Sequence, residues 1–235
     1  MSNNTIQNFS EEDIKNFSQM KSEMYRIATS MKAYRNANRF ETLFKRSLRA
    51  GYPVDFTRGG GDDTLLYLVL TSGTAEVVKI ANMLIEAGAD VNHTNWRNEN
   101  ALMMAARYSY GAKATDQLIP VLLPLTEDLD CKNKYGETAL MLFCQSLCVY
   151  SQYNFQESEK EIIQMFLGAG ANINDLLDPQ KWGMSNTPYW KNKSKSQWVE
   201  KRTEKLINLL LHSSIQETAK EELQNYNAAC YDNEL

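Results

Sequence analysis

The sequence predicts an all-α fold in which similar helix pairs repeat along the chain. Apolar runs end at a glycine followed by an apolar residue and Asn, as in EAGADVN and LGAGANIN. A second motif, in which a Leu stands two positions after a polar residue, recurs between these glycine-containing segments, as in GETALML. The 235 residues are 43% hydrophobic and 23% charged, which is typical of a globular rather than a disordered chain.

Residues 10–50 predict two helices that cap the N-terminal end. Apolar residues recur every three or four positions from Ile14 to Tyr34, which is the spacing of a helix with one buried face. Ser10 and Asp13 stand before this run in the spacing of a capping box. The next segment, RFETLFKRSLRAG, supplies a second amphipathic helix.

Residues 51–190 predict the repeats, and the glycines mark where helices end. Glycine enters the left-handed region without a side-chain penalty and so lets the last carbonyls of a helix be capped. The positions Gly51, Gly88, Thr126 and Gly170 correspond and lie 37, 38 and 44 residues apart. The third copy lacks the glycine, and it also contains Pro120 and Pro124. Since an interior proline costs a helix about 3 kcal/mol, this helix is expected to be short or kinked.

The second motif aligns three helix starts, at Thr64, Asn100 and Thr138, with a degenerate fourth copy in NTPYW at residues 186–190. NKYGETALMLF and LIEAGADVNHTN resemble the two halves of the ankyrin repeat, a hairpin turn plus two antiparallel helices in about 33 residues. The resemblance covers roughly residues 39–190. It implies an ankyrin-repeat solenoid of about four degenerate repeats, with helical caps at both ends, in one domain spanning residues 1–235.

The chain departs from the ankyrin pattern in two ways. Ala101 and Ala139 stand where the family has proline, and Met103 and Met141 stand where it has histidine. The long intervals indicate insertions between the helices of a pair, at residues 108–116 and 146–158. At the far end, residues 191–226 predict a closing helical pair, and residues 227–235 form an acidic tail. Caps are expected because stacked repeats bury their faces only on their neighbours.

No group of residues indicates catalysis, a metal site or a cofactor. His93 and His212 lie far apart in the predicted stack, so both are expected to be structural. Cys144 and Cys148 share one helix face but have no further Cys or His at zinc-ligand spacing. The segment RGGGDD lacks the Gly-Lys-Ser/Thr ending of a phosphate loop. The sequence therefore predicts a protein that is not an enzyme and has no small-molecule substrate.

The resemblance implies protein binding through the concave face and the hairpin tips, which are TNWRNE and KNKYGE here. Trp, Tyr and Arg dominate binding hot spots, so the tips are the first candidates. The expected partner-binding residues are Trp96, Arg97, Lys134 and Tyr135 on the tips, Tyr67, Met103, Arg107 and Met141 on the exposed side of the first helices, and Tyr108 and Tyr110 in an insertion. Gln145 is expected on the same exposed side of a first helix. Trp96 has two interpretations, a partner contact or a side chain that folds over the neighbouring hairpin.

The preferred function is a non-catalytic protein–protein interaction module. The chain also resembles stand-alone bacterial ankyrin proteins, including effectors delivered into host cells, and its CYDNEL ending is compatible with a type IV secretion signal. An inhibitor or immunity protein is an alternative. Another is an adaptor that binds anionic lipid or nucleic acid through Lys21–Arg49, which holds eight basic and two acidic residues.

The expected compartment follows from the cysteines and the apolar runs. Four cysteines suit a reducing environment, and no secretory signal or membrane-spanning run is present. We therefore expect a soluble, cytoplasmic protein, or one that reaches a host cytosol by a non-classical route.

Overall fold

The computed structural model describes residues 11–29, 37–57, 63–71, 77–108, 117–150 and 157–173. In these ranges the chain forms helices and no β-strand, which confirms the all-α prediction. The helices are α1 (Glu11–Thr29), α2 (Ala37–Arg49), α3 (Leu65–Thr71), α4 (Val77–Glu86), α5 (Ala101–Arg107), α6 (Ile119–Leu122), the 3-10 turn η3 (Leu123–Leu125), α7 (Ala139–Tyr150) and α8 (Glu157–Gly168).

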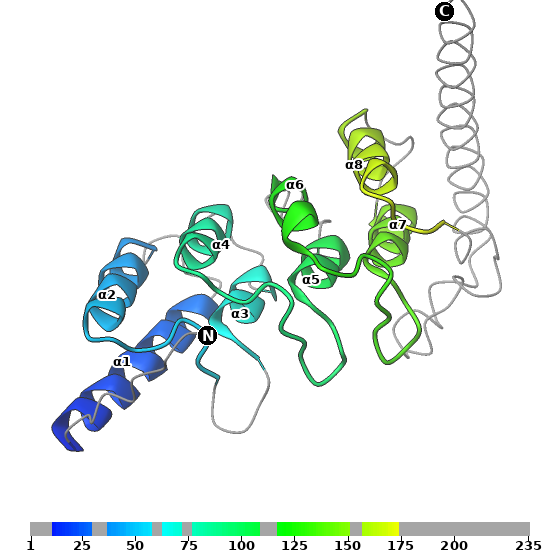
Figure 1. Cartoon of the computed structure of the whole chain (residues 1–235). Coiled ribbons are helices and arrows are strands. Elements are labelled where there is room, and N and C mark those ends of the chain that lie inside the picture. Colours follow the sequence, from blue (N-terminus) through cyan, green and yellow to red (C-terminus); the bar gives the residue numbers. More distant parts are fainter. Residues whose placement is uncertain are drawn as a thin grey trace, which may run out of the picture.

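The helices lie in two rows, and the chain alternates between them (Figure 1). One row contains α1, α3, α5 and α7, and each of these helices contacts the next one in the row. The other row contains α2, α4, α6 and α8. The loops that precede α5 and α7 extend to the same side of the first row (Figure 1). Equivalent loops therefore come close to one another although they are far apart in sequence.

One apolar cluster runs through the rows from α1 to α8. Its largest fully buried side chains include Phe40 and Phe44 of α2, Phe143 of α7 and Phe166 of α8. The rings of Phe143 and Phe166 lie 6.1 Å apart between centroids, so these two residues join α7 and α8, the last helix pair of the described residues. Each helix thus buries its apolar side on its neighbours.

The glycine stops are confirmed by the backbone geometry. Gly51, Gly88 and Gly170 have φ values of 80°, 90° and 92°, which lie in the left-handed region. After α4 the Gly88 amide donates to the Ile85 carbonyl at 2.9 Å. The amide of the next residue donates to the Leu84 carbonyl at 3.0 Å, which completes a Schellman cap.

The third copy of the repeat has the short helix that its two prolines predict. The α6 helix has four residues with Pro120 in its first turn, where a missing N–H costs nothing. It tightens into the three-residue η3, which contains Pro124 and ends at Leu125; the next residue, Thr126, is extended, with φ −86° and ψ 121°. Since Pro124 cannot donate a helical hydrogen bond, the helix does not continue.

The two N-terminal helices occupy the expected segments. Met24 and Ile27 of α1 are buried, as their spacing predicts. The burial of Tyr25 was not predicted, and its hydroxyl donates to the Phe56 carbonyl at 2.9 Å. The expected closing helices 191–226, the tail 227–235 and the fourth copy at 186–190 lie outside the described residues. None of the helices in the described ranges is long and apolar enough to cross a membrane.

Candidate protein-binding site at the hairpin tips

The two hairpin tips, tip 1 (residues 94–99) and tip 2 (residues 132–137), have the same local structure. The Asn95 side-chain oxygen accepts hydrogen bonds from the amides of Arg97 and Glu99 at 2.8 and 3.0 Å. Asn133 accepts from Tyr135 and Glu137 at 2.9 and 3.0 Å in the same way. Asn98 and Gly136 then take the left-handed conformation, with φ values of 59° and 80°. An Asn side chain that accepts hydrogen bonds from backbone amides of its own turn stabilises that tight turn.

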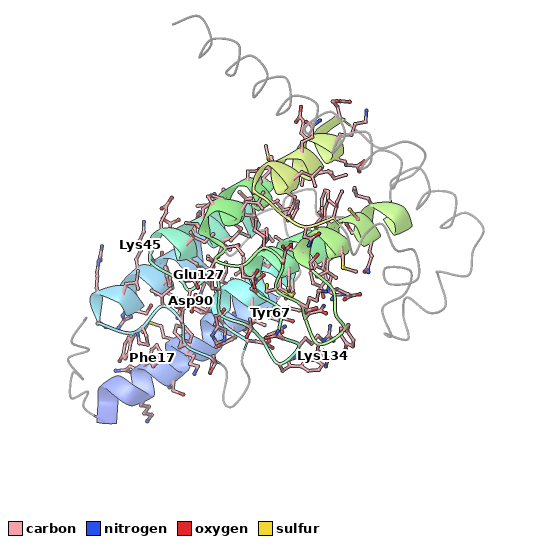
Figure 2. All side chains as sticks on the ribbon, turned by 45° about the vertical axis from the view of Figure 1, so that its right-hand side comes forward. Phe17, Lys45, Tyr67, Asp90, Glu127 and Lys134 are labelled. Atoms are coloured by element: carbon pink, nitrogen blue, oxygen red, sulfur yellow. The ribbon has the colours of Figure 1, made fainter. Side chains whose placement is uncertain are left out.

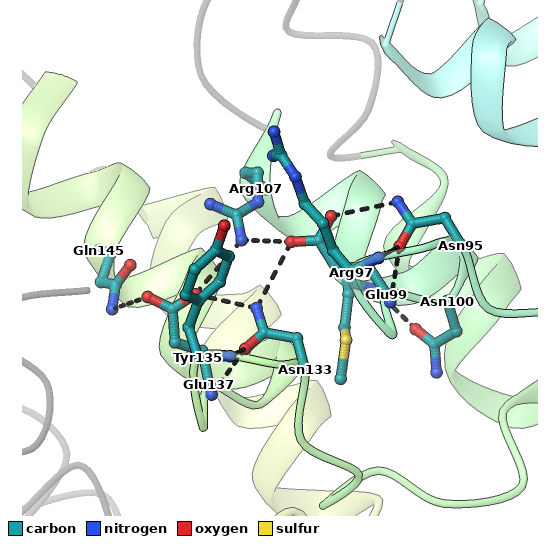
Figure 3. Close-up of polar contacts among 10 residues, drawn as sticks. Asn95, Arg97, Glu99, Asn100, Arg107, Asn133, Tyr135, Glu137 and Gln145 are labelled. Carbon is teal, nitrogen blue, oxygen red and sulfur yellow. Dashed lines mark hydrogen bonds and ion pairs between the residues drawn. The ribbon is translucent and has the colours of Figure 1, made fainter. Parts of the chain in front are cut away.

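Each tip buries a glutamate, and one arginine pairs with both glutamates (Figure 3). Glu99 and Glu137 are 1% and 2% exposed. Arg107 of α5 forms an ion pair with Glu99 and a second one with Glu137 at 3.3 Å. Only 11% of the Arg107 side chain is exposed. Because buried carboxylates lose their hydration, they depend on such a partner.

Side-chain amides satisfy the remaining oxygens of the two glutamates. Asn133 donates to Glu137 at 2.9 Å and to Glu99 at 3.4 Å, so it links the two tips. Gln145 of α7 donates to Glu137 at 3.2 Å. We refer to the buried set as the polar network; its members are Asn95, Glu99, Arg107, Asn133, Glu137 and Gln145 (Figure 3).

The tips are also joined at their outer ends. The Lys134 amide donates to the Arg97 carbonyl at 2.9 Å. The Asn98 side chain donates to the Lys132 carbonyl at 2.7 Å. These bonds between tips, together with the polar network below them, hold tip 1 and tip 2 at a fixed spacing.

Four side chains of the tips, two of them exposed and two partly exposed, form a basic and aromatic surface that we call the tip patch. It consists of Trp96, Arg97, Lys134 and Tyr135. Trp96 is 57% exposed, the largest exposed fraction among the large hydrophobic residues that the structure describes. The Lys134 ammonium lies 3.6 Å from the centroid of the Trp96 ring, and the Arg97 guanidinium carbon lies 4.6 Å from it. The Trp96 ring therefore meets the neighbouring hairpin, as one of its two interpretations expects, yet stays more than half exposed. The partner contact stays a prediction.

The expected exposure of the first helices is wrong at three positions. Met103, Met141 and Gln145 are 0%, 2% and 6% exposed. The reason is that α5 and α7 pack directly against each other, so side chains on the facing sides are enclosed. In this structure these three residues cannot contribute to a binding surface.

The other residues predicted from the sequence as partner contacts differ in their exposure. Arg107 is committed to the polar network, and Tyr67 is partly buried. Tyr108 is 37% exposed at the end of α5, whereas Tyr110 lies outside the described residues. Of the residues predicted from sequence, the four of the tip patch are joined by contacts across the two tips.

Tyr67 lies next to the polar network and has a perturbed pKa. Burial raises the pKa of its phenol to about 12, and the nearby carboxylates of Glu99 and Asp63 act in the same direction. A hydrogen bond with Asn95 opposes this effect. The folded state therefore favours the neutral phenol.

We expect this pKa shift to make stability fall between pH 10 and 12. Below pH 10 the phenol is protonated in both states, so Tyr67 adds no pH dependence. Between pH 10 and 12 the unfolded chain loses the proton while the folded chain keeps it, and stability then decreases as pH rises. The decrease is at most about 2 kcal/mol, because one pKa unit corresponds to about 1.4 kcal/mol and solvent screens a partly exposed ring.

Urea unfolding at pH 9.5 and 11.5, with wild type and Tyr67→Phe compared, measures this contribution. The variant removes the titrating group, so its stability is expected to fall less over this interval. Equal losses in the two proteins would contradict the assignment.

Two exposed acidic residues of the described loops, Asp90 and Glu127, lie away from the tip patch. Figure 2 shows Lys134 apart from both. Their backbone amides join successive loops: that of Asp90 donates to Asp55 and that of Glu127 to Asn92, at 2.9 and 3.0 Å. Burial raises the pKa of the Asp55 carboxyl. In the described part of the chain, no three His, Cys, Asp or Glu side chains are grouped as metal ligands.

A search of protein-family models finds none that matches this chain.

The polar network was not predicted from the sequence. The available signal was the phrase Asn-x-x-x-Glu, which occurs in both tips at Asn95–Glu99 and Asn133–Glu137.

Proposed function

We propose that the chain is a non-catalytic protein-binding module, built as an ankyrin-type solenoid of about four degenerate repeats between helical caps. The alternating helix rows, the Schellman caps and the two equivalent tips support this architecture. A bacterial effector that acts on host proteins and an inhibitor or immunity protein would both use such a module. The burial of Met103 and Met141 favours the tips over the helix face as the contact surface.

The observation that carries the proposal is the exposed Trp96 ring on a rigid tip. A large aromatic side chain that is 57% exposed contributes little to the fold, but it can be buried by a partner. The bonds between the tips fix its position before binding. A surface that is already ordered loses less conformational entropy when it binds.

The alternative site on the basic N-terminal helices receives less support. Glu23 pairs with Arg26 and Arg39, each at 2.9 Å. Glu41 pairs with Lys45 and Lys79 at 2.6 and 3.1 Å, and these lysines lower the pKa of its carboxyl. Several of the basic side chains are thus already engaged by carboxylates of the same chain.

Trp96→Ala is expected to abolish partner capture while the fold remains. The variant removes the exposed ring and two cation–π contacts, each worth about 0.5–1 kcal/mol at an exposed site. For a chain of this size, where 1 kcal/mol shifts the thermal midpoint by about 2–4 °C, we expect the midpoint to fall by no more than about 8 °C. Affinity capture read by quantitative mass spectrometry, beside a thermal unfolding curve, measures both effects.

Met165→Ala is the matched control, because Met165 is a 44% exposed apolar residue on α8. It is expected to retain every captured protein. If Trp96→Ala captured the same proteins as wild type, the tips would not be the binding site. If Trp96→Ala strongly destabilised the fold, Trp96 would belong to the core instead.

A further inference from the structure

The exposed charges of the two tips are all positive. Lys132 and Lys134 are exposed, and Arg97 is partly exposed. The only acidic residues of the tips are Glu99 and Glu137, which are buried and paired with Arg107. A molecule that approaches the tips therefore meets cations and an aromatic ring, without a competing carboxylate.

Among the described residues, no carboxylate pairs with the two cations of the tip patch. In the described ranges, neither Arg97 nor Lys134 forms an ion pair with a carboxylate. Both instead lie against Trp96, and Lys134 also lies 5.1 Å from the Tyr135 ring centroid. Arg97 is partly exposed and Lys134 is exposed. These groups retain donors for an anion that binds from outside.

We propose that the tip patch recognises an acidic segment of a partner protein, in which neighbouring Asp or Glu carboxylates flank an apolar side chain. This inference rests on the proposed function and gives the chemistry of the partner. The carboxylates accept hydrogen bonds from Lys134 and Arg97, and charge-assisted bonds of this type are stronger than neutral ones. The apolar side chain covers the exposed part of the Trp96 ring. Complementary charge also speeds association and excludes basic partners.

A single-stranded nucleic acid fits the tip patch less well. Binding of that kind needs aromatic faces on which bases stack, and a basic groove that follows several phosphates. Here two cations already lie over the Trp96 ring. The two tips contain three basic residues. This number suits a short anionic segment and is too small for a groove that follows several phosphates.

Fluorescence anisotropy with the full chain tests the proposal. The probe is a labelled peptide of about twelve residues, in which Asp and Glu flank a central Leu, and the matched peptide carries Asn and Gln instead. The acidic peptide is expected to bind at least about tenfold more tightly. The double variant Arg97→Gln and Lys134→Gln is expected to weaken its binding by at least about tenfold. The control Arg46→Gln and Arg49→Gln removes the same charge from exposed positions of α2 and should change binding less than twofold.

Equal binding of the acidic and neutral peptides, or no binding of either at low salt, would overturn the proposal. So would an equal effect of the two double variants, since net charge alone would then explain the affinity. Tighter, Trp96-dependent binding of a labelled oligouridine would assign the tip patch to nucleic acid instead. If protein capture still depended on Trp96 while the acidic peptide failed, the proposed function would stand and only this inference would fall.

Discussion

Replacing Arg107 by methionine is expected to lower the free energy of unfolding by about 3–5 kcal/mol, because two buried carboxylates lose the one cationic partner that they have among the described residues. Glu99 and Glu137 are both at most 2% exposed, so water cannot take the place of the guanidinium. Methionine keeps most of the apolar stem of the side chain and removes the charge. Urea unfolding at pH 7 measures the loss.

Two controls separate this effect from general damage. Arg49→Met removes an exposed arginine and should change stability by less than about 0.5 kcal/mol. Adding Glu99→Gln and Glu137→Gln to Arg107→Met should recover part of the loss, since the buried charges are then gone. A loss below about 1 kcal/mol for Arg107→Met alone would show that the polar network does not hold the tips.

Phe143→Ala is expected to cost about 3–5 kcal/mol, the range for truncating a buried aromatic side chain. Phe143 is 0% exposed on α7, and its ring lies 6.1 Å from that of Phe166 on α8. The change leaves a cavity between the members of the last described helix pair. Denaturant unfolding followed by circular dichroism measures the effect.

Phe143→Leu is the matched control and should lose clearly less, because much of the apolar volume remains. The exposed Met165→Ala should lose less than about 0.5 kcal/mol. If Phe143→Ala were as mild as Met165→Ala, α7 and α8 would not share a core.

The sequence was informative where one residue type has one physical role. Gly51, Gly88 and Gly170 predicted helix ends because glycine alone reaches the left-handed region without strain, and each has a positive φ. Pro120 and Pro124 predicted a short helix, and α6 ends after four residues. Apolar spacing likewise predicted the buried side of α1.

The sequence was less informative where burial depends on a neighbour. In the sequence, Glu99 and Glu137 have the pattern of exposed acidic residues. Their burial depends on the ion pairs with Arg107 of α5, and sequence spacing does not reveal these pairs. Met103 and Met141 were expected to be exposed because the resemblance to the ankyrin repeat implies it, but the contact of α5 with α7 encloses them. The four residues of the tip patch were named from the sequence, since Trp, Tyr and Arg dominate binding hot spots. The cation–π contacts across the tips were not predicted.

The central claim is that the polar network holds both tips together as one ordered surface. Hydrogen exchange of the Lys134 amide, followed residue by residue with NMR, tests it most directly, because that amide donates across the tips to Arg97. We expect exchange at least about a hundredfold slower than in an unstructured peptide, and loss of this protection in Arg107→Met. Exchange at the rate of a free peptide in the wild type would contradict the claim.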